Sequence, residues 1–110
     1  MTVKEIAEKL ELKVLGGESG LSATISGGYV SDLLSDVMGN ADTGNVWITL
    51  QTHKNVMAIA SLKDLAAIIL VNGNMPEKDM LEQSNEEGIP VLTTAKSTYE
   101  ITGKVYEILK

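Results

Sequence analysis

The sequence contains no cysteine, no arginine and no phenylalanine, and it has one tryptophan and one histidine among 110 residues. Without cysteine, disulfides, iron–sulfur ligation and thiol catalysis are excluded, and a reducing cytoplasmic location is expected. A single histidine cannot build an ordinary zinc site, and the aspartates do not follow calcium-loop spacing. We therefore expect no metal and no cofactor, and a core made of aliphatic side chains.

Nine lysines supply all the positive charge, and the net charge is −6. Bidentate recognition of phosphate is mainly a function of arginine, so an arginine-clamped nucleotide or phosphoryl-transfer site is disfavoured. Nucleic acid is excluded as a partner because neutralising its backbone requires a basic patch. Lysine side chains, or the amino terminus of a helix, can still hold a small anion.

Long apolar segments are also absent. The longest apolar run, Leu65 to Val71, is far shorter than the ~20 residues of a membrane helix. The amino end, Met1 to Glu5, is charged at once and lacks the apolar segment of a signal peptide. No membrane partner is expected.

The residues that are present predict alternating helices and strands. Thr2 and Glu5, and again Ser97 and Glu100, have the spacing of a capping box, which predicts a helix near each end of the chain. The helices are predicted at about 3–10, 33–38, 54–63, 76–87 and from 97 onward, and the strands at 12–15, within 21–31, and at 46–50, 65–71 and 89–92. This alternation predicts an α/β fold with parallel strands and crossover helices.

Polar residues follow three of the predicted strands. In open α/β sheets, ligands bind beyond the carboxyl ends of the strands. The candidate ligand-binding residues at this edge are Gln51, Thr52, His53, Asn72, Gly73, Thr93 and Thr94. His53 has no predicted nucleophile beside it, so we interpret it as a polar capping or surface residue and predict no catalytic residue.

The loop from Gly39 to Gly44 has the outer glycine spacing of a phosphate-binding loop. Asn45 and Val46 stand where that loop has lysine and a hydroxyl residue, and the segment precedes a strand instead of following one. We therefore interpret the segment from Asp42 to Asn45 as a turn, in which Asp and Asn bond to nearby backbone and Gly permits positive φ.

Residues from about 28 to 109 resemble the DRTGG domain family, whose motif aligns here with Ala41, Asp42, Thr43, Gly44 and Asn45. Asp42 replaces the arginine of the motif and Asn45 replaces its last glycine. The Val-Trp-Ile-Thr segment, the Glu-Glu-Gly-Ile-Pro-Val-Leu segment and the order of segments also resemble that family.

The resemblance implies a three-layer α/β/α sandwich with a mostly parallel, mixed sheet, similar to the amino-terminal domains of HPr kinase/phosphorylase and Mur ligases. It implies one DRTGG-like domain over residues 1–110, with a helix and short strands in 1–27 and a βαβα core in 28–110. Domains of this family occur as accessory units beside CBS pairs or phosphotransacetylase domains.

The leading functional hypothesis is a non-catalytic regulatory or sensor module that binds a small molecule or a protein partner at the carboxyl edge of its sheet. The alternative is a structural adaptor that acts as a homodimer or docks a partner, with Trp47 and the glycine-rich first half at the interface. A small enzyme is the third possibility, for which no paired nucleophile and base, metal cluster or cofactor motif is evident.

Overall fold

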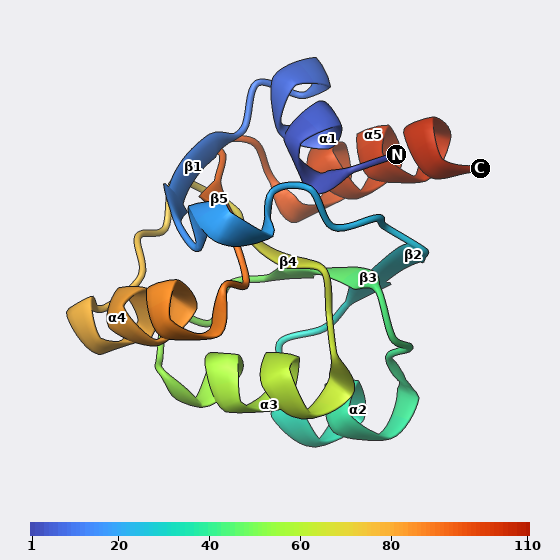
Figure 1. Cartoon of the computed structure of the whole chain (residues 1–110). Coiled ribbons are helices and arrows are strands. Elements are labelled where there is room, and N and C mark those ends of the chain that lie inside the picture. The colour runs from blue at the N-terminus through green and yellow to red at the C-terminus, as the bar shows by residue number, and fades with distance from the viewer.

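The computed structural model describes all 110 residues and shows a five-stranded sheet with helices on both faces (Figure 1). The strands are β1 (Lys13–Gly16), β2 (Gly27–Val30), β3 (Asn45–Thr49), β4 (Ala67–Leu70) and β5 (Val91–Thr93). The helices are α1 (Val3–Lys9), α2 (Leu34–Asn40), α3 (Asn55–Lys63), α4 (Lys78–Glu87) and α5 (Thr98–Leu109), with a short 3-10 helix η1 at Glu18–Gly20. The predicted α/β class is confirmed.

The sheet is mostly parallel. Its strand order is β1-β5-β4-β3-β2, in which β2 to β5 are mutually parallel and β1 pairs with β5 in the antiparallel direction. Helices α1 and α5 cover one face, and α2, α3 and α4 cover the other (Figure 1). The predicted three-layer sandwich with a mixed sheet is therefore confirmed.

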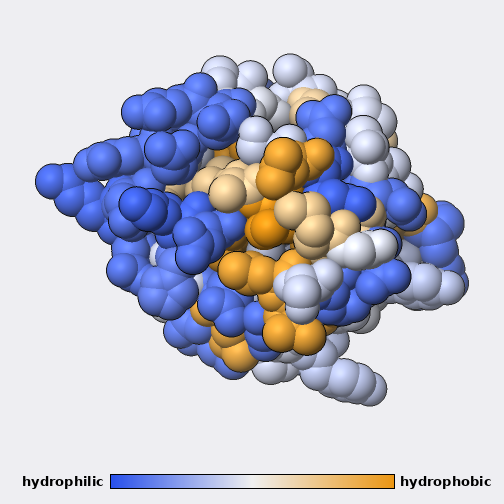
Figure 2. All heavy atoms as spheres, turned by 90° about the horizontal axis from the view of Figure 1, so that it is seen from below, coloured by the Kyte–Doolittle hydropathy of each residue, from blue (hydrophilic) through white to orange (hydrophobic).

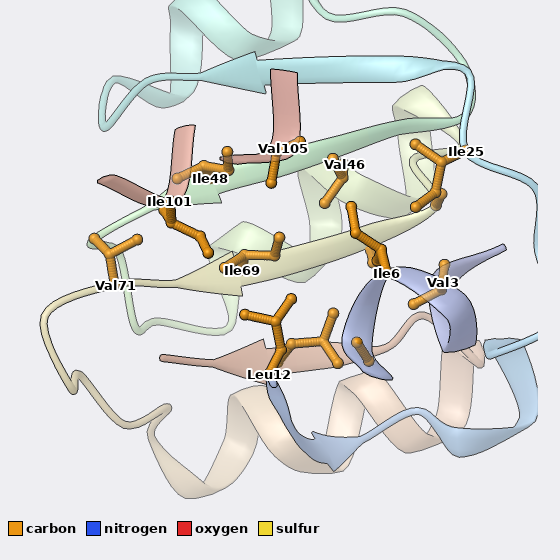
Figure 3. Close-up of a cluster of buried hydrophobic side chains, with 14 residues drawn as sticks. Val3, Ile6, Leu12, Ile25, Val46, Ile48, Ile69, Val71, Ile101 and Val105 are labelled. Carbon is orange, nitrogen blue, oxygen red and sulfur yellow. The ribbon is translucent and has the colours of Figure 1, made fainter. Parts of the chain in front are cut away.

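Two aliphatic cores result from the alternation of side chains along the inner strands. Successive strand residues point to opposite faces, so a strand covered on both sides must be apolar throughout. On the α1 and α5 side, Val46, Ile48 and Ile69 pack with Ile6 and Ile101 (Figure 3). The opposite core contains the intervening strand residues together with side chains of α2, α3 and α4: Trp47, Ile68, Leu70, Val91, Val37, Val56, Met57, Ala60 and Met80.

Trp47 lies inside this second core. Its side chain is completely inaccessible to solvent, and its indole Nε1 donates a hydrogen bond of 2.8 Å to the backbone oxygen of Ser31. Trp47 is therefore a packing residue of this core. Its alternative placement at a subunit interface is wrong, because the neighbouring helix α3 covers that side of the strand.

Several boundaries differ from the sequence-based ones. The predicted helix start at Pro76 is wrong, since α4 begins at Lys78 and the backbone N–H of Glu77 donates to the oxygen of Thr52 at 3.0 Å. Helix α2 continues through Gly39 and Asn40, where a loop was expected, and the Asn40 amide donates back to the Asp36 backbone oxygen at 3.2 Å. Tertiary contacts and local side-chain bonds thus shift the helix boundaries that Pro76 and Gly39 suggested.

A side-chain bond connects β2 to α2 and makes stability depend on pH. The hydroxyl of Tyr29 donates to Oδ1 of Asp36 at 2.8 Å. This bond, with smaller contributions from Ser31 and Asn40, holds the pKa of Asp36 below its ordinary value of 3.8. The same bond, together with burial, raises the pKa of Tyr29 above 10.0.

We expect this bond to contribute stability between the two pKa values. The Asp36 contribution is complete above about pH 4 and is lost as the pH falls through the lowered pKa of Asp36. The Tyr29 contribution is complete below about pH 10 and is lost as the pH rises through the raised pKa of Tyr29. Urea unfolding of Tyr29→Phe across this range should show weaker pH dependence at both ends, whereas Tyr99→Phe, at a 90% exposed position, should match the wild type. Identical acid and alkaline limbs in the wild type and Tyr29→Phe would contradict the assignment.

Candidate functional site

The loops that follow β3, β4 and β5 lie at one edge of the sheet, because these three strands are parallel. The seven residues predicted to bind a ligand all lie in these loops or at the strand ends that lead into them. Gln51, Thr52 and His53 follow β3, Asn72 and Gly73 follow β4, Thr93 ends β5 and Thr94 follows it. Whether they form one site depends on how the three loops are connected.

The β4 and β5 loops are joined by direct hydrogen bonds. The backbone N–H of Asn72 donates to the oxygen of Lys96 at 2.9 Å, and that of Gly73 donates to the oxygen of Thr94 at 2.8 Å. The hydroxyl of Thr93 donates to the backbone oxygen of Asn74 at 2.9 Å. Asn72 and Gly73 both adopt positive φ, which turns the chain back toward β5. These two loops therefore form one continuous surface.

The β3 loop is connected to the β4 loop at a different place. The Asn74 amide donates to the backbone oxygen of Leu50 at 3.4 Å, and the Glu77 N–H donates to the oxygen of Thr52. Nδ1 of His53 contacts the carboxylate of Glu77, with 63% and 51% of the two side chains exposed. His53 thus lies on the rim of these loops. It contacts a carboxylate and not the side chain of a nucleophile.

Asp32, which follows β2, is a residue that the sequence-based site omits. Its Oδ1 accepts hydrogen bonds from the Thr49 hydroxyl at 2.9 Å and from the Leu50 N–H at 2.7 Å. The side-chain amide of Gln51 donates to the backbone oxygen of Asp32 at 2.8 Å. Gln51 therefore connects β2 to β3, and its amide donor is used within the protein. The sequence offered one signal that could have identified Asp32, which is its position at the end of a strand.

A cavity of about 350 Å³ lies over the ends of β4 and β5 and includes three of the predicted residues. We call it the carboxyl-edge cavity; its lining residues are Glu11, Lys13, Gly73, Met75, Thr93, Thr94, Ala95 and Lys96. The other four predicted residues, Gln51, Thr52, His53 and Asn72, lie outside it. Lys13 was not predicted because it lies in β1, whose pairing with Thr93 in β5 has no signature in the sequence.

The lining of the carboxyl-edge cavity is suited to an anion. Two lysines, Lys13 and Lys96, and one acidic residue, Glu11, are the charged residues of the lining. The Thr94 hydroxyl accepts from the N–H of Lys96 at 3.2 Å, which leaves its own proton available to a ligand. The backbone N–H of Ala95 donates to no acceptor in the protein. Residues that carry three kinds of donor thus line one concave surface.

The motif loop lies at the opposite edge of the sheet, where β3 begins. The N–H of Asp42 donates to Oδ1 of Asn45 at 3.0 Å, and the N–H of Asn45 donates back to the oxygen of Asp42 at 3.1 Å. The Ser26 hydroxyl donates to the Thr43 oxygen at 2.7 Å, and Gly44 has a φ of 82°. Ala41 is buried in the second core. This geometry is that of a turn, and the motif loop is not part of the carboxyl-edge cavity.

A second hollow, of about 270 Å³, lies between the edge strand β2 and helix α5. Its lining is mainly apolar and includes Gly28, Val105 and Tyr106, together with Thr102, whose buried hydroxyl oxygen has no hydrogen-bond partner. None of the predicted site residues lines it. No three His, Asp or Glu side chains lie close enough together to hold a metal ion, and no helix is long and apolar enough to span a membrane.

The fold and the carboxyl-edge cavity define a small α/β domain with a mostly parallel sheet and a candidate site beyond the ends of β4 and β5. The family model of the DRTGG domain matches residues 5–108 of the 110. The chain belongs to the DRTGG domain family, as the resemblance over residues 28–109 indicated. The match begins in α1, well before residue 28, and Ile6 of α1 shares the first core with β3 and β4.

A solved structure has the same fold. It contains the CBS and DRTGG domains of the regulatory region of Clostridium perfringens pyrophosphatase, complexed with the activator diadenosine tetraphosphate, and its TM-score is 0.72 at 15% sequence identity. The likeness covers 96% of this chain but 45% of that one, so this chain spans less than half of that regulatory region. At this identity the likeness establishes the fold. No curated protein matches the sequence.

Proposed function

We propose that this chain is a non-catalytic regulatory module that binds a small anionic metabolite in the carboxyl-edge cavity. The observation that supports this most is the lining of the cavity, which combines Lys13 and Lys96 with Thr94 and with Ala95, whose backbone N–H has no acceptor in the protein. The net charge of the chain is −6, so two lysines in one cavity are a local exception to the charge of the whole.

The size and chemistry of the cavity favour a small ligand that carries phosphate or carboxylate. A volume of about 350 Å³ is near the lower end for small-molecule sites, which is roughly 300 Å³. Lysine supplies a point charge without the planar fork of arginine, so the ligand is held by charge and by the Ala95 amide more than by bidentate geometry. Because a regulatory region with this fold was solved with diadenosine tetraphosphate, adenine nucleotides are the first compounds to test.

The connected loops give ligand binding a way to affect other parts of the domain. A ligand over Gly73 and Thr94 contacts the loop that leads into α4, and Asn74 connects that loop to the one after β3. A ligand at this position is therefore linked to the loops after three strands. In a longer protein this loop surface is where a neighbouring domain would sense the ligand.

In this proposal His53 does not act as a catalytic base. His53 is exposed, contacts Glu77 and lies outside the carboxyl-edge cavity. A general base needs a proton donor within hydrogen-bond distance, and no such nucleophile contacts His53. Reproducible turnover of any nucleotide or phosphate ester that His53→Ala abolishes would restore the enzyme hypothesis.

Thermal unfolding with a panel of adenine nucleotides, diadenosine tetraphosphate and inorganic phosphate tests the proposal. A ligand at a hundred times its dissociation constant stabilises the folded state by about 2.7 kcal/mol, which raises the midpoint of a domain of this size by several degrees. Lys96→Ala should weaken the binding of the active compound by about tenfold, because it removes a charged hydrogen bond. Lys13→Ala should also weaken the binding of the active compound.

Lys104→Ala is the matched control, since Lys104 lies on α5 and outside the cavity. It should leave the ligand-induced shift unchanged. A panel that produces no shift, or a shift that both Lys13→Ala and Lys96→Ala leave intact, would contradict the proposed site.

A further inference from the structure

The sheet has two edge strands, and only one of them is protected against pairing with a further strand. β1 carries a charged residue, Lys13, and its pairing with β5 shifts register between Val14 and Gly16. Bulges and charged side chains are the usual means by which proteins keep an edge strand from pairing. β2 pairs with β3 in unbroken register, and the segment from Ser26 to Ser31 has no charged residue and no proline. The edge formed by β2 is therefore open (Figure 1).

The open edge of β2 presents backbone groups that have no partner in the chain. The N–H of Ser31 donates to the oxygen of Ile48 in β3 at 3.3 Å. Because the backbone groups of successive residues point to opposite sides of a strand, those of Gly28 and Val30 point away from β3. Neither of their N–H groups donates to a loop, a turn or a helix. What complements such a row of free groups is the backbone of another extended strand.

The two residues with free backbone groups also match each other across a twofold axis. Gly28 and Val30 both line the hollow between β2 and α5, and Val30 is 41% exposed. When a second β2 runs antiparallel with Tyr29 opposite Tyr29, each Gly28 lies opposite Val30 of the other copy and exchanges hydrogen bonds with it. Because glycine has no side chain, the valine has space over it, beside the hollow. The surface is thus complementary to a second copy of itself.

We propose that two copies of this chain pair through β2 in the antiparallel direction and form one continuous sheet. The free backbone groups of Gly28 and Val30 are then paired, and Val30 of each copy covers the hollow of the other. Tyr106, which lines the same hollow and is 69% exposed, is removed from water in this arrangement. Each copy has a net charge of −6, but no charged residue lies in the strands that meet. The carboxyl-edge cavity lies over β4 and β5, so the dimer is independent of the proposed ligand.

Sedimentation equilibrium of the full chain over a range of concentrations tests the proposal without any ligand. The wild type should form a dimer. Val30→Pro removes one N–H donor from each copy and should raise the dimer dissociation constant by about thirtyfold, the effect of two lost hydrogen bonds. Proline is tolerated on an edge strand where the N–H faces solvent, so the monomer should stay folded by circular dichroism. Val30→Thr keeps the N–H and the branched shape, and it should remain a dimer.

Gly28→Val tests the match between Gly28 and Val30 without removing a hydrogen bond. A Cβ atom at position 28 would lie 3.6 Å from Cγ1 of Val46 and 3.7 Å from Cγ1 of Val105, which are ordinary contact distances. The monomer therefore accommodates a side chain there. In the dimer that side chain takes the space of Val30 from the other copy, and the dissociation constant should rise by about tenfold.

Leu62→Ser is the matched control for the loss of an exposed apolar side chain. Leu62 is 72% exposed on α3, which lies on the face where apolar residues gather in the middle and hydrophilic residues surround them (Figure 2). It should leave dimerisation unchanged. A wild type that stays monomeric, or a dimer that neither Val30→Pro nor Gly28→Val weakens, would overturn the proposal.

Discussion

Gly17→Ala is expected to destabilise the protein by about 3 kcal/mol or more. Alanine would have to adopt the left-handed backbone conformation of Gly17, and its Cβ atom would overlap neighbouring backbone atoms. Gly17 has a φ of 69°, and a Cβ atom there would lie 2.3 Å from the backbone oxygen of Ile89 and 2.7 Å from Cα of Pro90. Those atoms are backbone at the entry to β5, so they cannot move aside as a flexible side chain could. The antiparallel contact of β1 with β5 should therefore be lost first.

Gly103→Ala is the control for this prediction. Gly103 lies in the interior of α5, and a Cβ atom there would meet nothing within 4 Å. Alanine in place of glycine within a helix should stabilise the protein by up to about 1 kcal/mol. Urea unfolding followed by circular dichroism measures both variants. If Gly17→Ala retained nearly the full stability of the wild type, the close approach of β1 and β5 would be wrong.

Trp47→Ala should cost about 3–5 kcal/mol, which is a large part of the stability of a domain of this size. The substitution leaves a cavity between β3 and α3 and removes the donor that satisfies the Ser31 oxygen at the end of β2. Trp47→Phe should be less damaging, because it keeps most of the ring volume and loses the hydrogen bond. The difference between the two variants separates the packing contribution from the polar one.

Unfolding of these variants must be followed by circular dichroism, since Trp47 is the only tryptophan. Tyr99→Ala, at an exposed position, should change the free energy of unfolding by less than about 0.5 kcal/mol. In the wild type, the fluorescence of Trp47 should shift to longer wavelength when urea exposes the indole. An emission maximum already typical of an exposed indole in the folded protein would contradict the burial of Trp47.

The inner strands and the end helices could be predicted because their signals are local. Continuous apolar runs predicted β3 and β4, since a strand covered on both faces has no polar position. The capping boxes predicted α1 and α5, and the structure shows the side chains of Thr2 and Ser97 accepting from the N–H groups of Glu5 and Glu100. The start of α4 could not be predicted, because it depends on a bond from Glu77 to Thr52 in another loop.

The candidate site was predictable in part. The sequence determined which residues follow which strand, and parallel pairing places Gly73, Thr93 and Thr94 at one edge. It did not determine that the side-chain amide of Gln51 would donate to the backbone oxygen of Asp32, or that His53 would contact Glu77 on the rim. These contacts join residues that are far apart in the sequence, and their geometry depends on the twist and packing of the whole sheet.

By itself, the sequence determined the α/β class, the aliphatic core, the family and the edge of the sheet at which polar side chains gather. The family follows from the resemblance of several segments and their order, and the other three follow from local periodicity or from composition, which are properties of neighbouring residues. Only the tertiary structure decided that Lys13 lies beside Thr93, that the motif loop lies at the far edge of the sheet, and that Leu62 of α3 stays exposed. Those facts depend on strand order and helix placement, which are settled by packing between distant segments.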